Sequence, residues 1–227
     1  LNKHSMSNQP KKIKKTWPTK KAMEQIYDQN LWGENNTEFY SGFGSHNSEL
    51  VKPYVKKVTE FLTSFKKPIT LLDLGCGDFN IGKQLVKHTK NYIAVDIVAP
   101  LIAYNKENFK ADNLEFLCLD IAVDDLPKAD CVIIRQVLQH LSNAEVQSIL
   151  NKLVDYKYVI FTEHIPKGNY MPNKDIISGQ GIRLKKQSGL DILKPPFNFK
   201  VKIEKELLSA NLGDGKEVIV SWLFEVF

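Results

Sequence analysis

Short apolar runs alternate along the first two thirds of the chain with segments whose apolar residues recur at helical spacing. The first run, residues 69–72, has the length and composition of a buried parallel strand. Similar runs follow at residues 91–98, 114–120, 129–136 and 156–162. Helical spacing occurs at residues 22–31, 80–88 and 142–155. A further helix is expected to begin after Asn47 or Ser48, either of which could cap it. This alternation predicts an α/β fold with a doubly wound, mostly parallel sheet.

The alternation ends after Pro166. Residues 167–196 contain four glycines and three prolines without a helical period, which predicts a long ordered loop over the carboxyl ends of the strands. Residues 197–227 surround the turn Gly213-Asp214-Gly215 and predict an antiparallel hairpin. The predicted organisation is a basic flexible tail (1–21) and one domain (22–227), comprising amino-terminal helices with a lid (22–65), a core (66–166), a loop on the substrate side (167–196) and a closing hairpin (197–227).

Composition narrows the class of protein. The chain has 227 residues, 43% hydrophobic and 25% charged, which is typical of a single globular domain. It contains no apolar run of membrane-spanning length and no secretory leader, so we expect a cytoplasmic protein without membrane contact. Three cysteines, Cys76, Cys118 and Cys131, show neither disulfide parity nor metal-ligand spacing and are interpreted as reduced thiols.

The net charge of +5 is concentrated at one end. Residues 1–21 hold seven lysines and no acidic residue, which leaves 24 basic and 26 acidic residues in the rest of the chain, a net charge of −2. A basic tail can bind nucleic acid or another acidic surface, and it can also simply keep the protein soluble. The nearly neutral body makes nucleic acid the less favoured partner and a small-molecule substrate the favoured one, while the oligomeric state stays open.

The strongest chemical signal lies in residues 69–82, ITLLDLGCGDFNIG. Gly75 and Gly77 would let the backbone turn sharply after the first strand and let a ligand approach it closely. A dinucleotide site would need a glycine at position 80, where the chain has Asn80, and Asp78 would repel a pyrophosphate. The pattern therefore favours a cationic ligand over a nicotinamide dinucleotide.

The pattern D-x-G-x-G followed by an acid resembles motif I of the class I S-adenosylmethionine-dependent methyltransferases, and the resemblance implies a Rossmann-like fold and that cofactor. The resemblance is close over about residues 46–166, and over residues 197–227 it is limited to the topology of a terminal antiparallel hairpin. Asp96 lies 19 residues after Gly77, where α/β nucleotide folds place an acid on the ribose hydroxyls. Asp120 with its apolar neighbour resembles the family's adenine position. The expected cofactor-binding residues are Asp73, Gly75, Cys76, Gly77, Asp78, Asp96, Ile97, Asp120, Ile121 and Gln136.

The acceptor should face the ends of the fourth and fifth strands. His140 is the first candidate for a general base and His164 the second, because histidine titrates in the range needed to take a proton from a hydroxyl or amine. For His140, the competing interpretation is a structural histidine bonded to the backbone. Residues 32–45, rich in glycine and aromatics, are a candidate lid with Trp32 facing the substrate, or else a structural connector.

Arginine is rare in this chain, where 29 of the 31 basic residues are lysine. The two arginines, Arg135 and Arg183, fall at the end of the fourth strand and in the long loop. Because the planar guanidinium suits carboxylates and phosphates, they are candidate ligands of an anionic acceptor. A structural ion pair with an internal acid is the alternative for both, and for Arg135 it is the favoured interpretation.

No metal is expected. Small-RNA ribose methyltransferases carry a Glu-x-x-Glu-His run after strand four and a histidine after strand five, which bind a divalent ion. Here the corresponding run is Gln136-x-x-Gln139-His140, which lacks the carboxylates that a hard cation needs. A transition metal on His140, Glu163 and His164 is the remaining alternative.

The favoured function is methyl transfer from S-adenosylmethionine to an oxygen, or less readily a nitrogen, of a small anionic or saccharide-type acceptor. The segments SGFGS, GCGDF and RQVLQHL resemble a bacterial subgroup that acts on sugars and small molecules. The alternatives are an RNA or protein methyltransferase that uses the basic tail, and a non-catalytic subunit that only binds the cofactor.

Overall fold

The structure is a computed structural model that describes residues 17–35, 37–213 and 215–227. Residues 1–16 of the predicted basic tail lie outside the described residues. Within the described ranges, no helix combines the length and apolar character needed to cross a membrane.

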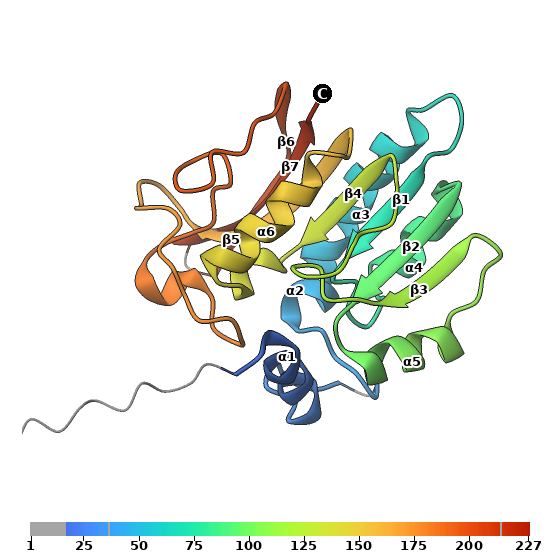
Figure 1. The fold of residues 1–227 in the computed structure, drawn as a ribbon, viewed down its shortest axis with the longest axis horizontal. Coiled ribbons are helices and arrows are strands. Elements are labelled where there is room, and N and C mark those ends of the chain that lie inside the picture. Colours follow the sequence, from blue (N-terminus) through green and yellow to red (C-terminus); the bar gives the residue numbers. More distant parts are fainter. Residues whose placement is uncertain (1–16, 36, 214) are drawn as a thin grey trace, which may run out of the picture.

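Seven strands form one sheet in the order β3-β2-β1-β4-β5-β7-β6 (Figure 1). The first five pair in parallel, and β7 runs antiparallel to both of its neighbours. This confirms the predicted α/β fold with a mostly parallel sheet and an antiparallel carboxyl-terminal hairpin. The strands are β1 (Thr70–Leu74), β2 (Asn91–Asp96), β3 (Leu114–Cys118), β4 (Cys131–Arg135), β5 (Tyr158–Pro166), β6 (Ile203–Leu212) and β7 (Glu217–Glu225).

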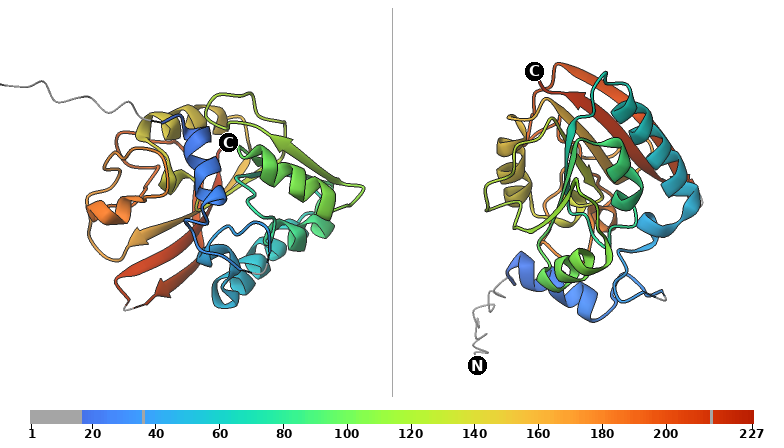
Figure 2. Two further views of the ribbon diagram at one scale, coloured as in Figure 1. Left: turned by 90° about the horizontal axis from the view of Figure 1, so that it is seen from below. Right: turned by 90° about the vertical axis from the view of Figure 1, so that its right-hand side faces the viewer.

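Helices cover both faces of the sheet (Figure 2). Helix α3 and the short α4 pack on one face, α6 packs on the other, and α5 lies against β2 and β3. The helices are α1 (Thr19–Asp28), α2 (Phe43–His46), α3 (Ser48–Thr63), α4 (Gly82–Leu85), α5 (Ala99–Asn108) and α6 (Asn143–Leu153), with 3₁₀ turns η1 (Val86–His88), η2 (Leu138–His140) and η3 (Arg183–Lys186).

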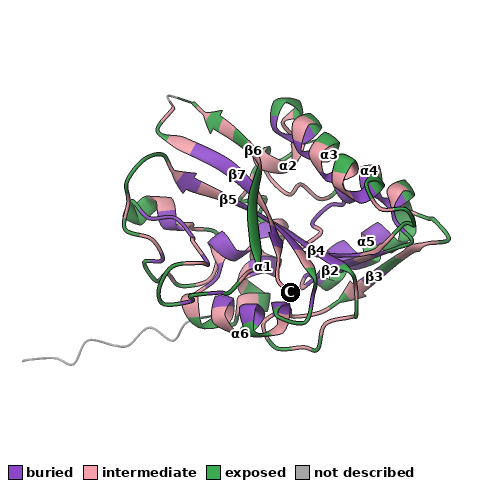
Figure 3. Ribbon diagram, turned by 90° about the horizontal axis from the view of Figure 1, so that it is seen from above, coloured by how far each residue is buried: buried purple, intermediate pink, exposed green. Residues whose placement is uncertain are grey.

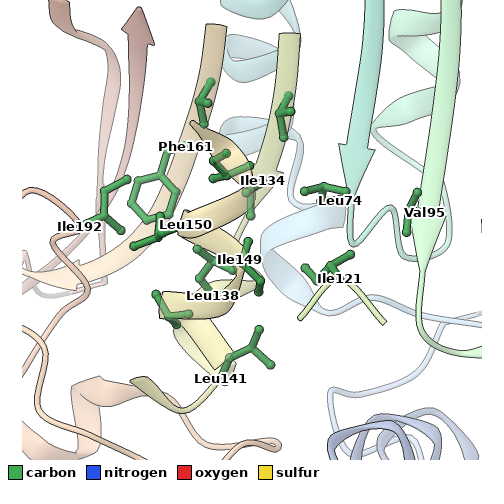
Figure 4. Close-up of a cluster of buried hydrophobic side chains, with 14 of the residues drawn as sticks. Leu74, Val95, Ile121, Ile134, Leu138, Leu141, Ile149, Leu150, Phe161 and Ile192 are labelled. Carbon is green, nitrogen blue, oxygen red and sulfur yellow. The ribbon is translucent and has the colours of Figure 1, made fainter. Parts of the chain in front are cut away.

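The two-residue period of the strands divides the core into two clusters. Leu72 and Leu74 of β1 contact the cluster that contains Ile149 and Leu150 of α6 (Figure 4), while Leu71 packs into the cluster on the α3 face. Both faces of the central strands are therefore buried, and the outer sides of α3 and α6 remain exposed (Figure 3). Double burial explains why these strands appear in the sequence as continuous apolar runs.

Helix α1 lies beyond the carboxyl ends of the strands, where the arrowheads point in Figure 1. Its buried residues, Met23 and Ile26, belong to the same apolar cluster as Ile121 and Leu141. The helix begins at Thr19, so residues 19–21, predicted as part of the flexible tail, are helical.

Three predicted elements differ from the structure. The helix expected at residues 80–88 is shortened to α4 and η1, because Phe79 adopts a left-handed backbone (φ 63°) that delays the helix until Gly82. Strand β5 continues to Pro166, since β7 pairs with it along its whole length, so Glu163 and His164 lie inside the strand rather than after it. Residues 167–196 contain η3 as their one regular element, in line with the predicted loop.

Gly82 allows Phe79 to pack into the core. The Phe79 ring is fully buried and contacts Tyr92, Phe109 and Phe116 edge to face. A Cβ at position 82 would lie within 3.0 Å of both Phe79 and the Tyr92 hydroxyl.

We therefore predict that Gly82→Ala destabilises the protein by about 1–3 kcal/mol, through overpacking of this ring cluster. Thermal unfolding followed by circular dichroism measures the effect. Gly181→Ala is the matched control, because a Cβ there would meet nothing within 4 Å. Equal melting temperatures for the two variants would contradict this account of α4.

Candidate active site

One cavity of about 440 Å³ opens at the carboxyl ends of the parallel strands. It lies where the strand order reverses between β1 and β4, which is the usual binding position in open α/β sheets. All ten residues predicted to bind the cofactor line it, together with Trp32, Arg135 and His140. The volume falls within the range of sites for small ligands.

A glycine bend forms one wall of the cavity. After β1 the chain turns through Gly75 (φ 82°) and Gly77 (φ 54°). The amides of Gly75 and Cys76 both donate to the Val95 carbonyl, at 2.8 and 2.9 Å. A Cβ on Gly75 would overlap the side chain of Val137, so this turn admits no other residue without movement.

Asp96 ends β2 beside this bend. Its Oδ2 accepts a hydrogen bond from the Gly77 amide (3.1 Å), and its Oδ1 accepts one from the Val98 amide (3.1 Å). Burial raises the pKa of Asp96, and these backbone donors oppose the shift. Each carboxylate oxygen keeps a lone pair for a further donor.

Asp120 lies two residues beyond β3. Its Oδ1 accepts from the Ala122 amide at 3.0 Å, which holds the carboxylate at the cavity rim. The apolar side chains of Ile97, Leu119 and Ile121 line the cavity as well. This end of the cavity therefore combines an acceptor with an apolar surface.

Asp73 is the most deeply held carboxylate of the set. It is 5% exposed, and its Oδ2 accepts from the Tyr92 hydroxyl at 2.7 Å. Burial raises the pKa of Asp73 to about 7, while the Tyr92 hydrogen bond and Arg135 oppose the shift. The cavity thus contains a carboxyl group that titrates near neutrality.

The candidate lid is fastened to the glycine bend through Asp78. Its Oδ2 accepts from the Ser41 amide (2.8 Å) and contacts His46 Nε2 (2.5 Å), and the Asp78 amide donates to Ser41 Oγ (2.8 Å). Tyr27 of α1 hydrogen-bonds the same Ser41 hydroxyl at 3.0 Å. Asp78 therefore holds the segment that covers the cavity. Sequence reasoning missed His46 and Ser41 as its partners.

His140 stands at the other end of the cavity, in η2. Its Nδ1 lies 3.1 Å from the Gly179 carbonyl, which can only accept, so Nδ1 carries the proton and Nε2 is an acceptor, which faces the Gln139 side-chain amide nitrogen at 3.3 Å. The ring tilts against Trp32 with centroids 5.2 Å apart. Burial lowers the pKa of His140 to about 4, so the imidazole is neutral at physiological pH.

Arg183 does not lie at the acceptor site to which the sequence assigned it. This side chain is 1% exposed, and its guanidinium donates to the carbonyls of Leu138, Gln139 and Leu141 and to Asn143 Oδ1. It does not line the cavity within the described residues. The prediction was wrong because backbone carbonyls in and next to η2, which the sequence does not reveal, accept from the guanidinium inside the protein.

His164 and Glu163 also lie away from the cavity. His164 pairs with Glu217 Oε2 of the neighbouring β7 at 2.9 Å. Glu163 is fully buried, and its pKa is raised to about 8 by burial, with Arg183 opposing the shift. In the described part of the chain, no group of three His, Cys, Asp or Glu side chains is arranged to hold a metal, so the alternative set with His140 has no geometric support.

Helix α1 is the main contribution that sequence reasoning missed. Thr19, Met23 and Tyr27 line the cavity, and Thr19 hydrogen-bonds Glu145 at the start of α6. The spacing of Met23 and Tyr27 was visible in the sequence, but nothing in the pattern indicated which surface this helical face would cover.

Comparison with known proteins identifies the domain. Residues 72–156 match the family model of a methyltransferase domain. The chain is 31% identical to an uncharacterized RNA methyltransferase of Chlamydia pneumoniae over 164 residues, 67% of this chain and 39% of that protein. It is 34% identical to the malonyl-acyl-carrier-protein O-methyltransferase of Acetivibrio thermocellus over 92 residues, 39% of this chain and 32% of that protein. The chain therefore spans well under half the length of these curated relatives.

Solved structures agree on the fold. The N-methyltransferase NodS from Bradyrhizobium japonicum, in complex with S-adenosylhomocysteine, has a TM-score of 0.65 at 11% identity and covers 90% of this chain and 98% of its own. The magnesium protoporphyrin IX methyltransferase from Synechocystis, with bound S-adenosylmethionine, has a TM-score of 0.56 at 15% identity. The match covers 91% of this chain and 97% of that one. These findings confirm the resemblance to class I S-adenosylmethionine-dependent methyltransferases, whereas the predicted subgroup stays a prediction.

Proposed function

We propose that this protein methylates an oxygen of a small anionic or saccharide-type acceptor, with nitrogen as the alternative. The premise is that residues 72–156 form an S-adenosylmethionine-dependent methyltransferase domain. The observation that carries the proposal is that one cavity joins a glycine bend, carboxylates at or just beyond the carboxyl ends of β1, β2 and β3, and a neutral histidine.

The cavity residues fit the cofactor. Acidic side chains suit the positive sulfonium and ammonium groups of S-adenosylmethionine, which supplies an electrophilic methyl carbon when bound. Asp96 has free lone pairs for both ribose hydroxyls, and Ile97 and Ile121 offer an apolar surface for the adenine ring. The missing Cβ of Gly75 lets the backbone approach the ligand.

His140 is the proposed general base. Its Nδ1–H bond to Gly179 fixes the tautomer and leaves Nε2 as the proton acceptor, from which the acceptor hydroxyl would displace the Gln139 amide that lies at 3.3 Å. Because burial lowers its pKa to about 4, it is a weak base that takes the proton as the acceptor oxygen begins to bond to the methyl carbon. Helix α1, Trp32 and residues 41–45 line the cavity and would exclude water and align the acceptor, which supplies much of the rate in a displacement reaction.

The acceptor end favours a small polar molecule. Trp32 presents an aromatic face beside His140, and Gln180 and Lys185 of the long loop line the same cavity. An aromatic face with hydrogen-bonding neighbours suits a saccharide, and the Lys185 ammonium suits an anionic group. Because the guanidinium of Arg183 donates to backbone carbonyls, Lys185 is the residue of this loop that would bind an anionic acceptor.

A second candidate is an RNA methyltransferase. It is favoured by the name of the Chlamydia pneumoniae relative and by the seven lysines of residues 1–21. In this case the tail would bind phosphates next to the cavity.

Binding of the cofactor is the first test. We expect S-adenosylmethionine to bind with a dissociation constant on the order of micromolar to millimolar by isothermal calorimetry. Asp96→Ala should weaken binding by about 10-fold or more, since it removes charge-assisted hydrogen bonds, whereas Asp112→Ala on the exposed surface should not. Binding of a nicotinamide dinucleotide instead would refute the proposal. A metabolite screen for methylated products then identifies the acceptor.

Deletion of residues 1–21 separates the two candidates. A small-molecule enzyme should keep its turnover apart from the effect of losing Thr19, which Thr19→Ala in the full chain measures separately. An RNA enzyme should lose affinity for RNA together with its steep salt dependence. Filter binding of RNA at 50 and 200 mM salt distinguishes these outcomes.

His140→Ala should lower kcat by about 100-fold or more while cofactor affinity persists. Because the pKa of His140 is lowered to about 4, the base is deprotonated throughout the neutral range, so kcat at saturating cofactor should be flat from about pH 5.5 to 8, whereas the pKa of Asp73 near 7 would change cofactor affinity in this range. An acidic limb of kcat near pH 6.5 under these conditions would contradict this assignment. Cofactor binding without turnover on any acceptor would instead favour a non-catalytic subunit.

A further inference from the structure

Gln139 lies beside the proposed base, and the orientation of its side-chain amide is fixed. The residue belongs to η2, is 6% exposed and lines the cavity. The pairing of β4 with β5 ends at Thr162, and two residues further along β5 the His164 amide donates to Gln139 Oε1 at 3.0 Å. Because a backbone amide can only donate, the oxygen of the Gln139 side chain faces His164 and its nitrogen faces His140.

These contacts form a chain of hydrogen bonds that runs in one direction. The Gly179 carbonyl accepts from His140 Nδ1 at 3.1 Å, so the imidazole accepts at Nε2 from Gln139 Nε2, which lies 3.3 Å away. The Gly179 amide donates in turn to the His140 carbonyl at 3.0 Å. Arg183 donates to the carbonyls of Leu138 and Gln139, at 3.2 and 3.4 Å, and holds the turn that carries both side chains. The two nitrogens are therefore held side by side at the cavity.

A hydroxyl oxygen fits between these two nitrogens. Because they are 3.3 Å apart, one oxygen can lie about 2.9 Å from each of them. In that position the hydroxyl donates its proton to His140 Nε2 and accepts the N–H of Gln139 that it displaces from the imidazole. Gln139 Oε1 stays on the His164 amide, so the displaced N–H remains directed at the same place.

Candidate acceptor atoms differ in the lone pairs and protons that they bring to this position. A hydroxyl has two lone pairs, of which one accepts from Gln139 and the other attacks the methyl carbon. A neutral amine has a single lone pair, so a hydrogen bond from Gln139 occupies the electrons that the reaction needs, and an ammonium has none. A carboxylate has no proton for His140 Nε2 and would set lone pair against lone pair. The hydroxyl is the group that satisfies both nitrogens and can still react.

We propose that Gln139 restricts the methyl acceptor to a hydroxyl group, so that the product is a methyl ether. This inference rests on the proposed function and deepens it, because it names the methylated atom and leaves an anionic group of the acceptor to binding alone, as at Lys185. The hydroxyl oxygen forms its bond to the methyl carbon with one lone pair, while the carbon–sulfur bond breaks and leaves its electron pair on sulfur. The hydroxyl proton passes to His140 Nε2 and is later lost to solvent.

The hydrogen bond from Gln139 to His140 is tested first, on the protein without substrate. Long-range nitrogen–proton correlation spectra report which ring nitrogen of a histidine carries the proton, and His140→Ala identifies the signals. We expect a proton on Nδ1 and a hydrogen-bonded Nε2 in the wild type. In Gln139→Leu the Nε2 resonance should move towards that of an imidazole nitrogen without a donor. A proton on Nε2 in the wild type, or an unmoved resonance in the variant, would overturn the proposal.

The methylated atom is identified from the products. A metabolite extract is incubated with S-adenosylmethionine that carries an isotope-labelled methyl group, and carbon NMR separates methyl ethers, methyl esters and N-methyl groups by chemical shift. We expect methyl ethers alone from the wild type, and esters or N-methyl products would overturn the proposal. If no labelled product forms, the proposed function itself fails, and the spectra of His140 keep that result distinct from failure of the hydroxyl restriction.

Gln139→Leu is then compared with the wild type on the acceptor found in this screen and on its analogue with an amino group in place of the hydroxyl. The ratio of kcat/KM for the two should shift by about 10-fold or more towards the amine, because the variant lacks the N–H that occupies the amine lone pair. An unchanged ratio would contradict the role of Gln139. Gln147→Leu, which removes an amide that hydrogen-bonds Asn151 along α6, is the control and should keep the wild-type ratio.

Gln139→Glu separates the donor from the rest of the side chain. It keeps an oxygen for the His164 amide but turns a second oxygen, which only accepts, towards His140. A carboxylate there favours the protonated imidazole, so kcat on the hydroxyl acceptor should fall by about 10-fold or more and an acidic limb should appear in its pH profile. A variant with the wild-type kcat and pH profile would overturn the proposal even if Gln139→Leu does not fold.

Discussion

The arrangement of the site depends on the sharp bend that follows β1. At Gly75 the backbone reverses with two amides on the Val95 carbonyl of β2, and the side chain of Val137, after β4, occupies the space that a Cβ would need. One residue thus connects three strands at the position where the strand order reverses. Because a larger side chain would push these strand ends apart, the shape of the cavity floor follows from the absence of one carbon atom.

A second constraint comes from the charges gathered around that bend. Asp73, Asp78, Asp96 and Asp120 all line the cavity; the first three accept from donors elsewhere in the fold, and Asp120 accepts from the nearby Ala122 amide. Those donors stabilise the carboxylates in a partly dry cavity, and at Asp73 burial outweighs the Tyr92 hydrogen bond and raises the pKa. A cavity of this kind is better neutralised by a cation than by a pyrophosphate, which is the physical reason for preferring a sulfonium cofactor to a dinucleotide.

The parts of the site that follow local rules were predictable from the sequence. Strand ends meet at one edge of a parallel sheet, so carboxylates placed after successive apolar runs had to converge, and Asp96 and Asp120 do so. Long-range pairing was not predictable. The extension of β5 through Glu163 and His164 depends on β7, some fifty residues later, and the attachment of the lid through His46 depends on a single tertiary contact. Neither leaves a periodic signal in the chain.

The two arginines show where residue-type reasoning stops. The scarcity of arginine indicated that each one has a specific partner. That partner need not be an anion, because backbone carbonyl oxygens also accept hydrogen bonds from a guanidinium. Both arginines keep a buried Nε without a partner, but Arg183 donates to the carbonyls of Leu138 and Leu141 and thereby anchors the long loop to η2, whereas Arg135 lines the cavity. The two arginines therefore differ in how many backbone acceptors surround the guanidinium. For Arg135 the fold supplies one, which leaves the rest of its hydrogen-bonding capacity to whatever the cavity binds.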